Sequence, residues 1–305
     1  MTLPLPVVFV RNIEHSFPES GKTWLTTLPA LLDEAAKRWG LTLGKPFLLS
    51  YNYVCAAKMA DGADVVLKAG VPNPELTSEI EALSLYNGRG AVRLIDSDAE
   101  KGLLLEERLR PGTMLLEVQD DDRATEIAAG AMRTLWRPVP EPNRLIRLED
   151  WFLGFKQLRQ RFGGSGPIPP TLFETAEGLA AELLREEPVV LHGDLHHYNV
   201  LKANILKAGD GWLAIDPKGV IGPRGYDAAP WMLNPSEGFL RGPQAAHRAR
   251  RRFAILSEQL GLERSRIRGW AIAHALLSAW WDMDEQGSGG EHAIHCAQLF
   301  DQLNI

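Results

Sequence analysis

The sequence is poor in cysteine and has no long apolar run. Cys55 and Cys296 are its only cysteines, and no Cys-x-x-Cys pair occurs, so we expect no disulfide framework and a reducing compartment. No uninterrupted apolar run reaches the length of a transmembrane helix. The apolar part of the N-terminus is short, contains two prolines and follows no basic residue, which makes it a poor signal peptide. We therefore expect a cytoplasmic protein that does not insert into a membrane.

Two further absences narrow the class of protein. The sequence has no internal repeat and no Walker phosphate loop, because its glycine-rich stretch 163–167 is not followed by Lys and Ser or Thr. A formal net charge of -6 does not favour nucleic acid as a partner and suits a cationic small molecule. The four arginines between positions 248 and 252 lie in a predicted helix, 245–260. In an acidic chain they fit a solvated helix face better than a nucleic-acid patch.

The most informative stretch runs from residue 189 to residue 219. An apolar run delivers Asp194 into a loop, Asn199 follows five residues later, and a second apolar run delivers Asp216. One carboxylate can take a proton from an attacking hydroxyl, while the Asn and the second carboxylate can hold a hard cation on phosphate oxygens. We interpret Asp194 as the catalytic base and the other two residues as ligands of a hard cation.

Two other interpretations of this stretch stay open. His192, His196 and His197 resemble a zinc site, but two histidines four residues apart need a helix, and Gly193 argues against one. We expect His192 to be a packed residue that orients the loop. A structural turn without chemistry is the second alternative, because Asp and Asn are common turn residues.

A lysine at the end of an apolar strand marks the N-terminal half. Strands are expected over 46–69, with a first pair interrupted near residues 51–52 and a hairpin at Asp61-Gly62. The last strand ends in Lys68, which is costly to bury unless an anion pairs with it. The helix predicted over 74–86 offers three glutamates, of which we favour Glu79 as the partner. A solvated Lys68 at a sheet edge is the alternative.

A hinge is expected after the strand 103–107, which follows another strand predicted over 91–95. An Arg-Leu-Arg-Pro-Gly stretch begins at Arg108 and would break the sheet, so we place a domain boundary there. In a kinase such a hinge meets the adenine edge, which makes Glu106 and Glu107 candidate nucleotide-binding residues. No glycine-rich phosphate loop precedes them. Beyond the hinge, helices are predicted over 124–136, 148–161, 172–185, 245–260, 267–281 and 291–303.

The acceptor site is sought in two segments. A Gly- and Pro-rich loop follows Asp216 and leads to Asp227. The Asp227 carboxylate can either accept hydrogen bonds from backbone amides of the catalytic loop or contact substrate. Residues 280–285 place aromatic faces beside carboxylates, which suits a polycation, although a charged helix end would look the same. The candidate substrate residues are His196, Asp227, Trp231, Trp281, Asp282 and Glu285.

These motifs together resemble the aminoglycoside/hydroxyurea phosphotransferase family, and within it the streptomycin 6-phosphotransferase branch. The resemblance is carried by Val-Leu-Lys at 66–68, Asn-Gly-Arg-Gly at 87–90, Leu-Leu-Leu-Glu at 103–106, His-Gly-Asp-Leu-His-His-Tyr-Asn at 192–199, Ile-Asp-Pro-Lys-Gly at 215–219 and Leu-Ser-Ala-Trp-Trp at 277–281. It implies ATP and Mg²⁺ as cofactors. It also implies that Lys68 binds the phosphates, that Glu79 holds Lys68, that Asp194 is the base, and that Asn199 and Asp216 bind magnesium.

The resemblance further implies an α+β, bilobal, protein-kinase-like fold. We expect a small β-rich nucleotide-binding lobe over 1–107, with an N-terminal extension of about 45 residues, and a larger, mostly helical lobe over 108–305. The expected activity is transfer of the γ-phosphate of ATP to a hydroxyl of a small, cationic, aminoglycoside-like molecule. The alternatives are a sugar or amino-alcohol kinase of the same fold, a nucleotide-binding pseudokinase that acts through a partner, and a nucleic-acid-binding protein that uses its basic helix.

Overall fold

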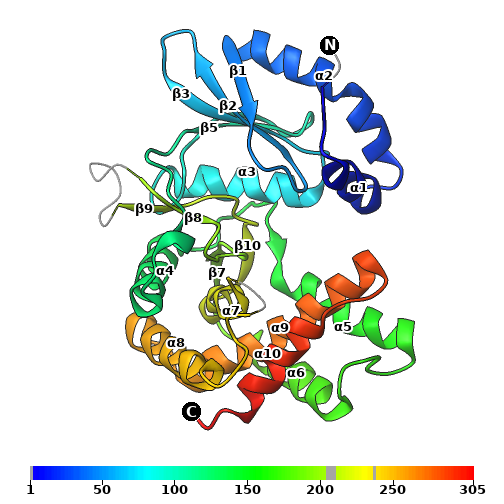
Figure 1. The fold of residues 1–305 in the computed structure, drawn as a ribbon, viewed down its shortest axis with the longest axis vertical. Helices are drawn as coiled ribbons and strands as arrows, with labels where there is room; N and C mark the ends of the chain where they lie inside the picture. The colour runs from blue at the N-terminus through cyan, green and yellow to red at the C-terminus, as the bar shows by residue number, and fades with distance from the viewer. Residues whose placement is uncertain (1–2, 204–210, 236–237) are drawn as a thin grey trace.

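The computed structural model describes residues 3–203, 211–235 and 238–305, and it has two lobes (Figure 1). The smaller lobe holds a five-stranded sheet and the larger lobe is mostly helical, which confirms the expected fold class. The placement of the boundary at residues 107 and 108 stays a prediction. The sheet has the order β1-β2-β3-β5-β4, with β1 (Leu41–Pro46), β2 (Tyr53–Met59), β3 (Asp64–Ala69), β5 (Leu103–Glu107) and β4 (Leu94–Asp98).

The two faces of this sheet are chemically different because side chains alternate along each strand. On β3, Leu67 is fully buried on the face covered by α1 (Val7–Ser16) and α2 (Ser20–Trp39). Lys68 points to the opposite face, where it meets α3 (Pro74–Tyr86). The N-terminal extension therefore closes the outer side of the sheet, and the inner side is left for the lysine and its partners.

The N-terminal elements agree with the sequence only in part. The hairpin at Asp61-Gly62 and the helix 74–86 are confirmed. Of the predicted first strand pair, the second strand is confirmed as β2, but the first was misplaced: β1 ends at Pro46, and Leu48, which we assigned to a strand, is 99% exposed in a loop. The strand predicted over 91–95 begins only at Leu94. Helix α1 was not predicted.

The larger lobe is built around helix α9. Figure 1 shows α9 crossing this lobe, and it packs against each of the helices α5, α6, α7, α8 and α10. Ile267, Trp270 and Leu277 on α9 are fully buried, as expected for a core stripe. The helices are α4 (Asp121–Leu135), α5 (Leu148–Phe162), α6 (Pro170–Leu183), α7 (Ala228–Leu233), α8 (Ala245–Leu260), α9 (Arg264–Gln286) and α10 (Glu291–Gln302).

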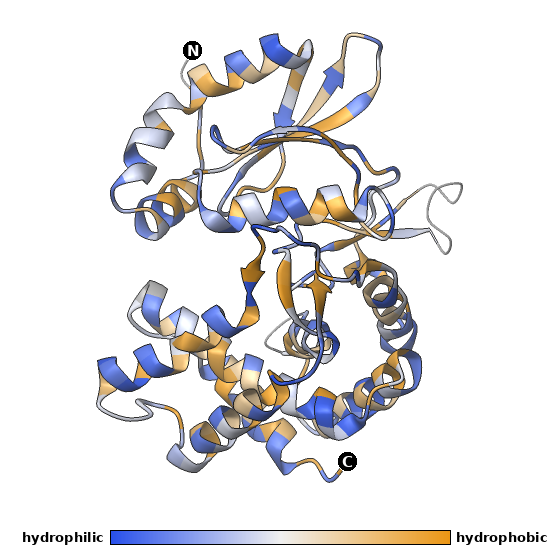
Figure 2. Cartoon of the chain, turned by 180° about the vertical axis from the view of Figure 1, so that it is seen from behind, coloured by the Kyte–Doolittle hydropathy of each residue, from blue (hydrophilic) through white to orange (hydrophobic). Residues whose placement is uncertain are grey.

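Short strands carry the segment from residue 188 to residue 223 through the middle of this lobe. A three-stranded sheet has the order β6-β10-β7 and a separate hairpin pairs β8 with β9. Figure 2 shows these central strands as largely hydrophobic, in line with their burial between helices. Their bounds are β6 (Ile146–Arg147), β7 (Pro188–Leu191), β8 (Val200–Lys202), β9 (Trp212–Ala214) and β10 (Val220–Pro223). None of the helices in the described ranges has the length and apolar character needed to cross a membrane.

The basic helix α8 pairs with the acidic start of α4. Arg252 is fully buried and donates to the Asp121 carboxylate at 2.7 Å and to the backbone carbonyls of Trp231 and Asn234 at 3.0 and 2.6 Å. Arg251 forms an exposed ion pair with the neighbouring Asp122. The expectation of a solvated face was therefore wrong for Arg252, because its guanidinium is used inside the lobe.

We predict that Arg252→Met lowers the free energy of unfolding by about 3–5 kcal/mol, because it leaves Asp121 and two carbonyl groups without their donor. Arg251→Met is the matched control and should cost about 1 kcal/mol or less, because it removes an exposed pair. Urea denaturation followed by tryptophan fluorescence measures both. Equal losses in the two variants would contradict the structural role of Arg252.

Candidate active site

The loop between β7 and β8 is held by a buried histidine. His192 is fully buried, and its Nδ1 accepts a hydrogen bond from the Asp194 backbone at 3.2 Å. Its Nε2 therefore carries the proton and donates to the Ile215 carbonyl at 2.9 Å. Burial lowers the pKa of His192 to about 3, so the ring is neutral. This confirms that His192 orients the loop, and the described residues contain no cluster of three or more metal-binding side chains that would support zinc.

Asp227 fixes the same loop from its other side. Its carboxylate accepts hydrogen bonds from the backbone amides of His192 and Gly193, at 3.2 and 2.8 Å, and from Trp136 Nε1 at 3.0 Å. Burial raises the pKa of Asp227 to about 6 in spite of these donors. Gly193 adopts a φ of 83°, and a Cβ atom there would lie 2.8 Å from Val220. Asp227 is thus a fully buried anchor, and it has no exposed surface for a substrate.

Trp231 does not reach a cavity. It is fully buried, and its ring stacks on His197 with a centroid separation of 3.7 Å. The Nε2 atom of His197 in turn meets the Arg252 guanidinium at 3.2 Å. The expectation that Trp231 contacts substrate was wrong, because the ring is used to pack the catalytic loop against the lobe.

Lys68 joins the two lobes through two carboxylates. Its ammonium lies 2.6 Å from Glu79 on α3 and 3.1 Å from Asp216, which follows β9 in the other lobe. Burial disfavours the ammonium, but the charges of Asp216 and Glu79 outweigh it and raise the pKa of Lys68. Burial likewise works against the Asp216 carboxylate, and Lys68 more than compensates, so the pKa of Asp216 is lowered. Lys68 and Asp216 are therefore charged, whereas burial raises the pKa of Glu79 although Lys68 acts in the opposite direction.

A cavity of about 710 Å³ opens beside this cluster. Lys68, Asp194, Asn199 and Asp216 line it, and so does the segment 50–52. Residues 16–17 from the end of α1 add a wall that no sequence motif indicated. The cavity thus brings the predicted base, both predicted cation ligands and the predicted phosphate lysine together.

Asn199 and Asp216 are suited to a hard cation. The Asn199 side-chain amide donates to the Asp194 carbonyl at 3.0 Å, which leaves its amide oxygen as a ligand atom. Amide and carboxylate oxygens are the ligands that Mg²⁺ uses together with substrate phosphates. Both residues line the cavity into which Lys68 points, so they fit a magnesium–nucleotide complex.

The two candidate adenine-site glutamates have different surroundings. Glu107 accepts a hydrogen bond from the Arg93 backbone at 2.9 Å. Glu106 is 5% exposed, and its Oε1 has no hydrogen-bond partner among the described residues. Burial raises its pKa to about 8, although Lys68 acts in the opposite direction. Neither side chain lines the cavity beside Lys68, and contact of their backbone with adenine stays a prediction.

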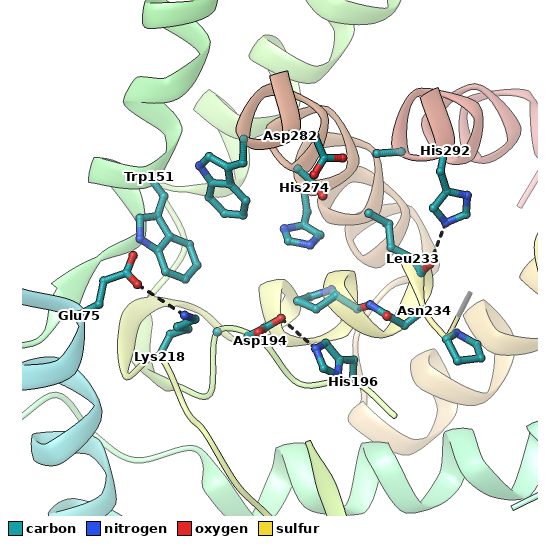
Figure 3. Close-up of a pocket in the computed structure, with 16 residues that line it drawn as sticks. Glu75, Trp151, Asp194, His196, Lys218, Leu233, Asn234, His274, Asp282 and His292 are labelled. Carbon is teal, nitrogen blue, oxygen red and sulfur yellow. Dashed lines mark hydrogen bonds and ion pairs between the residues drawn. The ribbon is translucent and has the colours of Figure 1, made fainter. Parts of the chain in front are cut away.

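A second cavity of about 610 Å³ lies on the other side of Asp194 (Figure 3). In Figure 3, Asp194 and His196 face His274 and Asp282 of α9 across this space, and Trp151 of α5 lies at one end. The Trp151 and Trp281 rings are 5.5 Å apart, edge to face. Three of the predicted substrate residues, His196, Trp281 and Asp282, line it. The Glu285 side chain is outside the described residues.

Several lining residues were not predicted. Trp151, His274 and His292 come from three different helices and share no local motif. His274 is 7% exposed, bonds the Tyr226 hydroxyl at 2.9 Å and still reaches the cavity. Lys218 lies two residues after Asp216, so its position in a catalytic motif could have identified it.

The raised pKa of Glu106 generates a prediction about stability. The ordinary pKa of Glu106 is 4.5, and its pKa in the native protein is about 8. Between these two pH values, Glu106 is protonated in the native protein and ionised in the unfolded chain. Glu106 therefore favours the native state at low pH, and this contribution is lost as the pH rises through 8. Relative to the native sequence, Glu106→Gln should gain about 2 kcal/mol in free energy of unfolding between about pH 6.5 and about pH 9.

Urea denaturation at both pH values measures this difference. Glu107→Gln is the control on the next residue and should leave the pH dependence of the native sequence unchanged. A constant offset between Glu106→Gln and the native sequence would show that Glu106 does not titrate in this range.

Comparisons with known proteins agree with this geometry. The chain is 33% identical over 285 residues to streptomycin 6-kinase of Streptomyces glaucescens, covering 92% of this chain and 91% of the relative. It is 31% identical over 273 residues to hydroxyurea phosphotransferase of Kitasatospora aureofaciens, covering 87% and 76%. A choline/ethanolamine kinase family protein from Mesorhizobium loti has the same fold, with a TM-score of 0.61, 13% identity and coverage of 89% and 94%.

The family itself is identified by a sequence profile. The profile described as aminoglycoside/hydroxyurea antibiotic resistance kinase matches residues 45–287, a range that contains Lys68, Glu79, Asp194, Asn199 and Asp216. The resemblance drawn from the motifs is thereby confirmed, and this chain belongs to the aminoglycoside/hydroxyurea antibiotic resistance kinase family.

Proposed function

We propose that this protein transfers the γ-phosphate of ATP to a hydroxyl group of a streptomycin-like aminoglycoside. The observation that carries the proposal is the meeting of two cavities at Asp194. One cavity holds the Lys68–Glu79–Asp216 cluster, which suits a magnesium–nucleotide complex. The other is large enough for a drug-sized molecule. A relative of this chain from Streptomyces glaucescens is a streptomycin 6-kinase, which supports this acceptor.

The proposed reaction assigns one task to each group. Asp194 accepts the proton of the attacking hydroxyl, and burial, which raises its pKa, makes it a stronger base. Lys68 binds the α- and β-phosphates, while Asn199 and Asp216 hold Mg²⁺. When bound, Mg²⁺ supplies positive charge to the phosphate oxygens. Catalysis then rests on positioning and on charge neutralisation.

The second cavity also favours a cationic acceptor. Glu75, Asp194 and Asp282 contribute carboxylates, and Trp151 and Trp281 contribute aromatic faces. Carboxylates and aromatic rings are the groups that bind ammonium and guanidinium ions. Hydroxyurea is a second candidate acceptor, because a relative is a hydroxyurea phosphotransferase. It is small and neutral, however, and would leave most of a cavity of about 610 Å³ unfilled.

A substrate panel tests the acceptor. With MgATP, we expect streptomycin to give ADP release and a phosphorylated product by mass spectrometry, because its cations and size match the cavity. Hydroxyurea, choline, a hexose and a neutral macrolide complete the panel. Turnover of hydroxyurea, choline or the hexose, with none for streptomycin, would replace the proposed acceptor. Nucleotide binding without turnover of any acceptor would favour a pseudokinase.

Two variants test the assigned chemistry. Asp194→Asn should lower kcat by about 10²- to 10⁴-fold, because it removes the general base, while MgATP binding stays within a few-fold. Asp216→Asn should instead weaken magnesium-dependent ATP binding. Asp301→Asn, on the exposed end of α10, is the control and should match the native chain in both measurements. Retained turnover in Asp194→Asn would contradict its role as the base.

A further inference from the structure

Four residues line both cavities: Glu75, Asp194, His196 and Lys218. A phosphoryl group that moves from the nucleotide cavity to the acceptor cavity must pass the side chains that the two cavities share. Among these four, Lys218 is the residue with a permanent positive charge at neutral pH. The proposed reaction gives roles to Lys68, Asp194, Asn199 and Asp216, but none to Lys218.

The backbone of Lys218 is fixed against the catalytic loop. Its amide donates to the His192 carbonyl at 2.8 Å, and the next amide, of Gly219, reaches the same carbonyl at 3.3 Å. The turn that brings it there requires a φ of 54° at Asp216 and 65° at Gly219. A Cβ atom built on Gly193 would lie 3.2 Å from the Lys218 Cβ. The lysine therefore leaves the backbone directly beside the residue that precedes Asp194.

The side chain of Lys218, in contrast, is loosely held. Its ammonium lies 3.4 Å from the Glu75 carboxylate of α3 (Figure 3), and the two side chains are 41% and 52% exposed. Lys68 differs in every respect: it is 2% exposed and lies close to both Glu79 and Asp216. Lys68 is thus committed to its carboxylates, whereas Lys218 is free to turn toward a group entering the junction.

We propose that Lys218 is a catalytic cation that contacts the oxygens of the γ-phosphoryl group during transfer; this rests on the proposed phosphotransferase function. In that step the acceptor oxygen forms a bond to phosphorus and its proton passes to Asp194. The bond from phosphorus to the β-phosphate oxygen breaks, and ADP leaves with the electron pair. Negative charge on the phosphoryl oxygens then lies between the two cavities. A cation at that point stabilises the transition state more than the ground state.

Glu75 has a supporting role in this proposal. It holds the Lys218 ammonium at the junction when no phosphoryl group is present. The incoming phosphoryl oxygens then replace the Glu75 carboxylate as the partner of Lys218. Because Glu75 lies near the start of α3 and Lys218 follows β9, the ion pair also spans the two lobes at the place where transfer occurs.

The test uses the complete chain and a mimic of the transferred group. Affinity is measured calorimetrically for MgADP alone and for MgADP with aluminium fluoride, which imitates a phosphoryl group in transit. In Lys218→Met, we expect MgADP affinity within about 3-fold of native, while the gain in affinity on adding aluminium fluoride falls by about 10-fold or more. With an acceptor, kcat should fall by about 10²- to 10³-fold at nearly constant KM for ATP. Lys218→Arg should restore part of both effects.

Lys58→Met is the matched control, because Lys58 forms a comparable lysine–carboxylate pair with Asp64 at 3.8 Å and lines neither cavity. It should behave as the native chain in every measurement. A native fluoride response in Lys218→Met would overturn the proposal. Equal loss of MgADP and fluoride affinity would also overturn it, since the lysine would then only shape the nucleotide cavity.

The fluoride measurement needs no acceptor, so it separates this proposal from the proposed acceptor. A native chain that phosphorylates no member of the substrate panel, yet loses its fluoride response in Lys218→Met, would contradict the aminoglycoside acceptor and support Lys218. A native chain that does not bind MgADP would overturn both.

Discussion

The ion cluster of Lys68 with Glu79 and Asp216 is the interaction on which the rest of the site depends. A lysine that is 2% exposed costs several kcal/mol to bury without carboxylate partners. One partner comes from α3, and the other from a residue 148 positions away in the second lobe. Because the buried Lys68 ammonium binds both carboxylates, it holds α3 against the sheet and keeps the predicted cation ligand Asp216 next to the lysine. Lys68 and its two carboxylate partners all line the cavity that is proposed to bind the nucleotide.

A second set of buried polar groups holds the catalytic loop, which has no regular secondary structure of its own. Asp227 binds two of its backbone amides, and the neutral His192 ring binds a third. On the far side, Arg252 contacts His197. These groups are buried, so removing any one of them would leave a polar atom inside the lobe without a partner. The loop that carries Asp194 is thus held by its own His192 and by partners from two other segments, and the Asp194 side chain lines both cavities.

The parts of this structure that the sequence predicted are those with local physical signals. Helix 74–86 is bounded by the Asn73 cap and Asn87, and β5 begins with three consecutive leucines; both were placed correctly. The exposed loop at Leu48 was assigned to a strand because it is as apolar as one. The spacing of Asp194, Asn199 and Asp216 in the sequence was enough to predict that they meet, and all three line one cavity. Trp151, His274 and His292 meet only because separate helices pack together. No pattern of neighbouring residues in the sequence predicts that packing.

The division between the two cavities explains how one family can serve different acceptors. The groups assigned to phosphoryl transfer lie in the sheet lobe and in the segment from residue 192 to residue 219. The far wall of the acceptor cavity comes instead from α5, α9 and the start of α10. Substitutions on those helices can change the size and charge of that wall without touching Lys68 or Asp194. Relatives of similar identity to this chain, 33% and 31%, are accordingly a streptomycin kinase and a hydroxyurea phosphotransferase. Acceptor choice should therefore follow side chains such as Trp151 and Asp282, while the residues proposed for phosphoryl transfer stay the same.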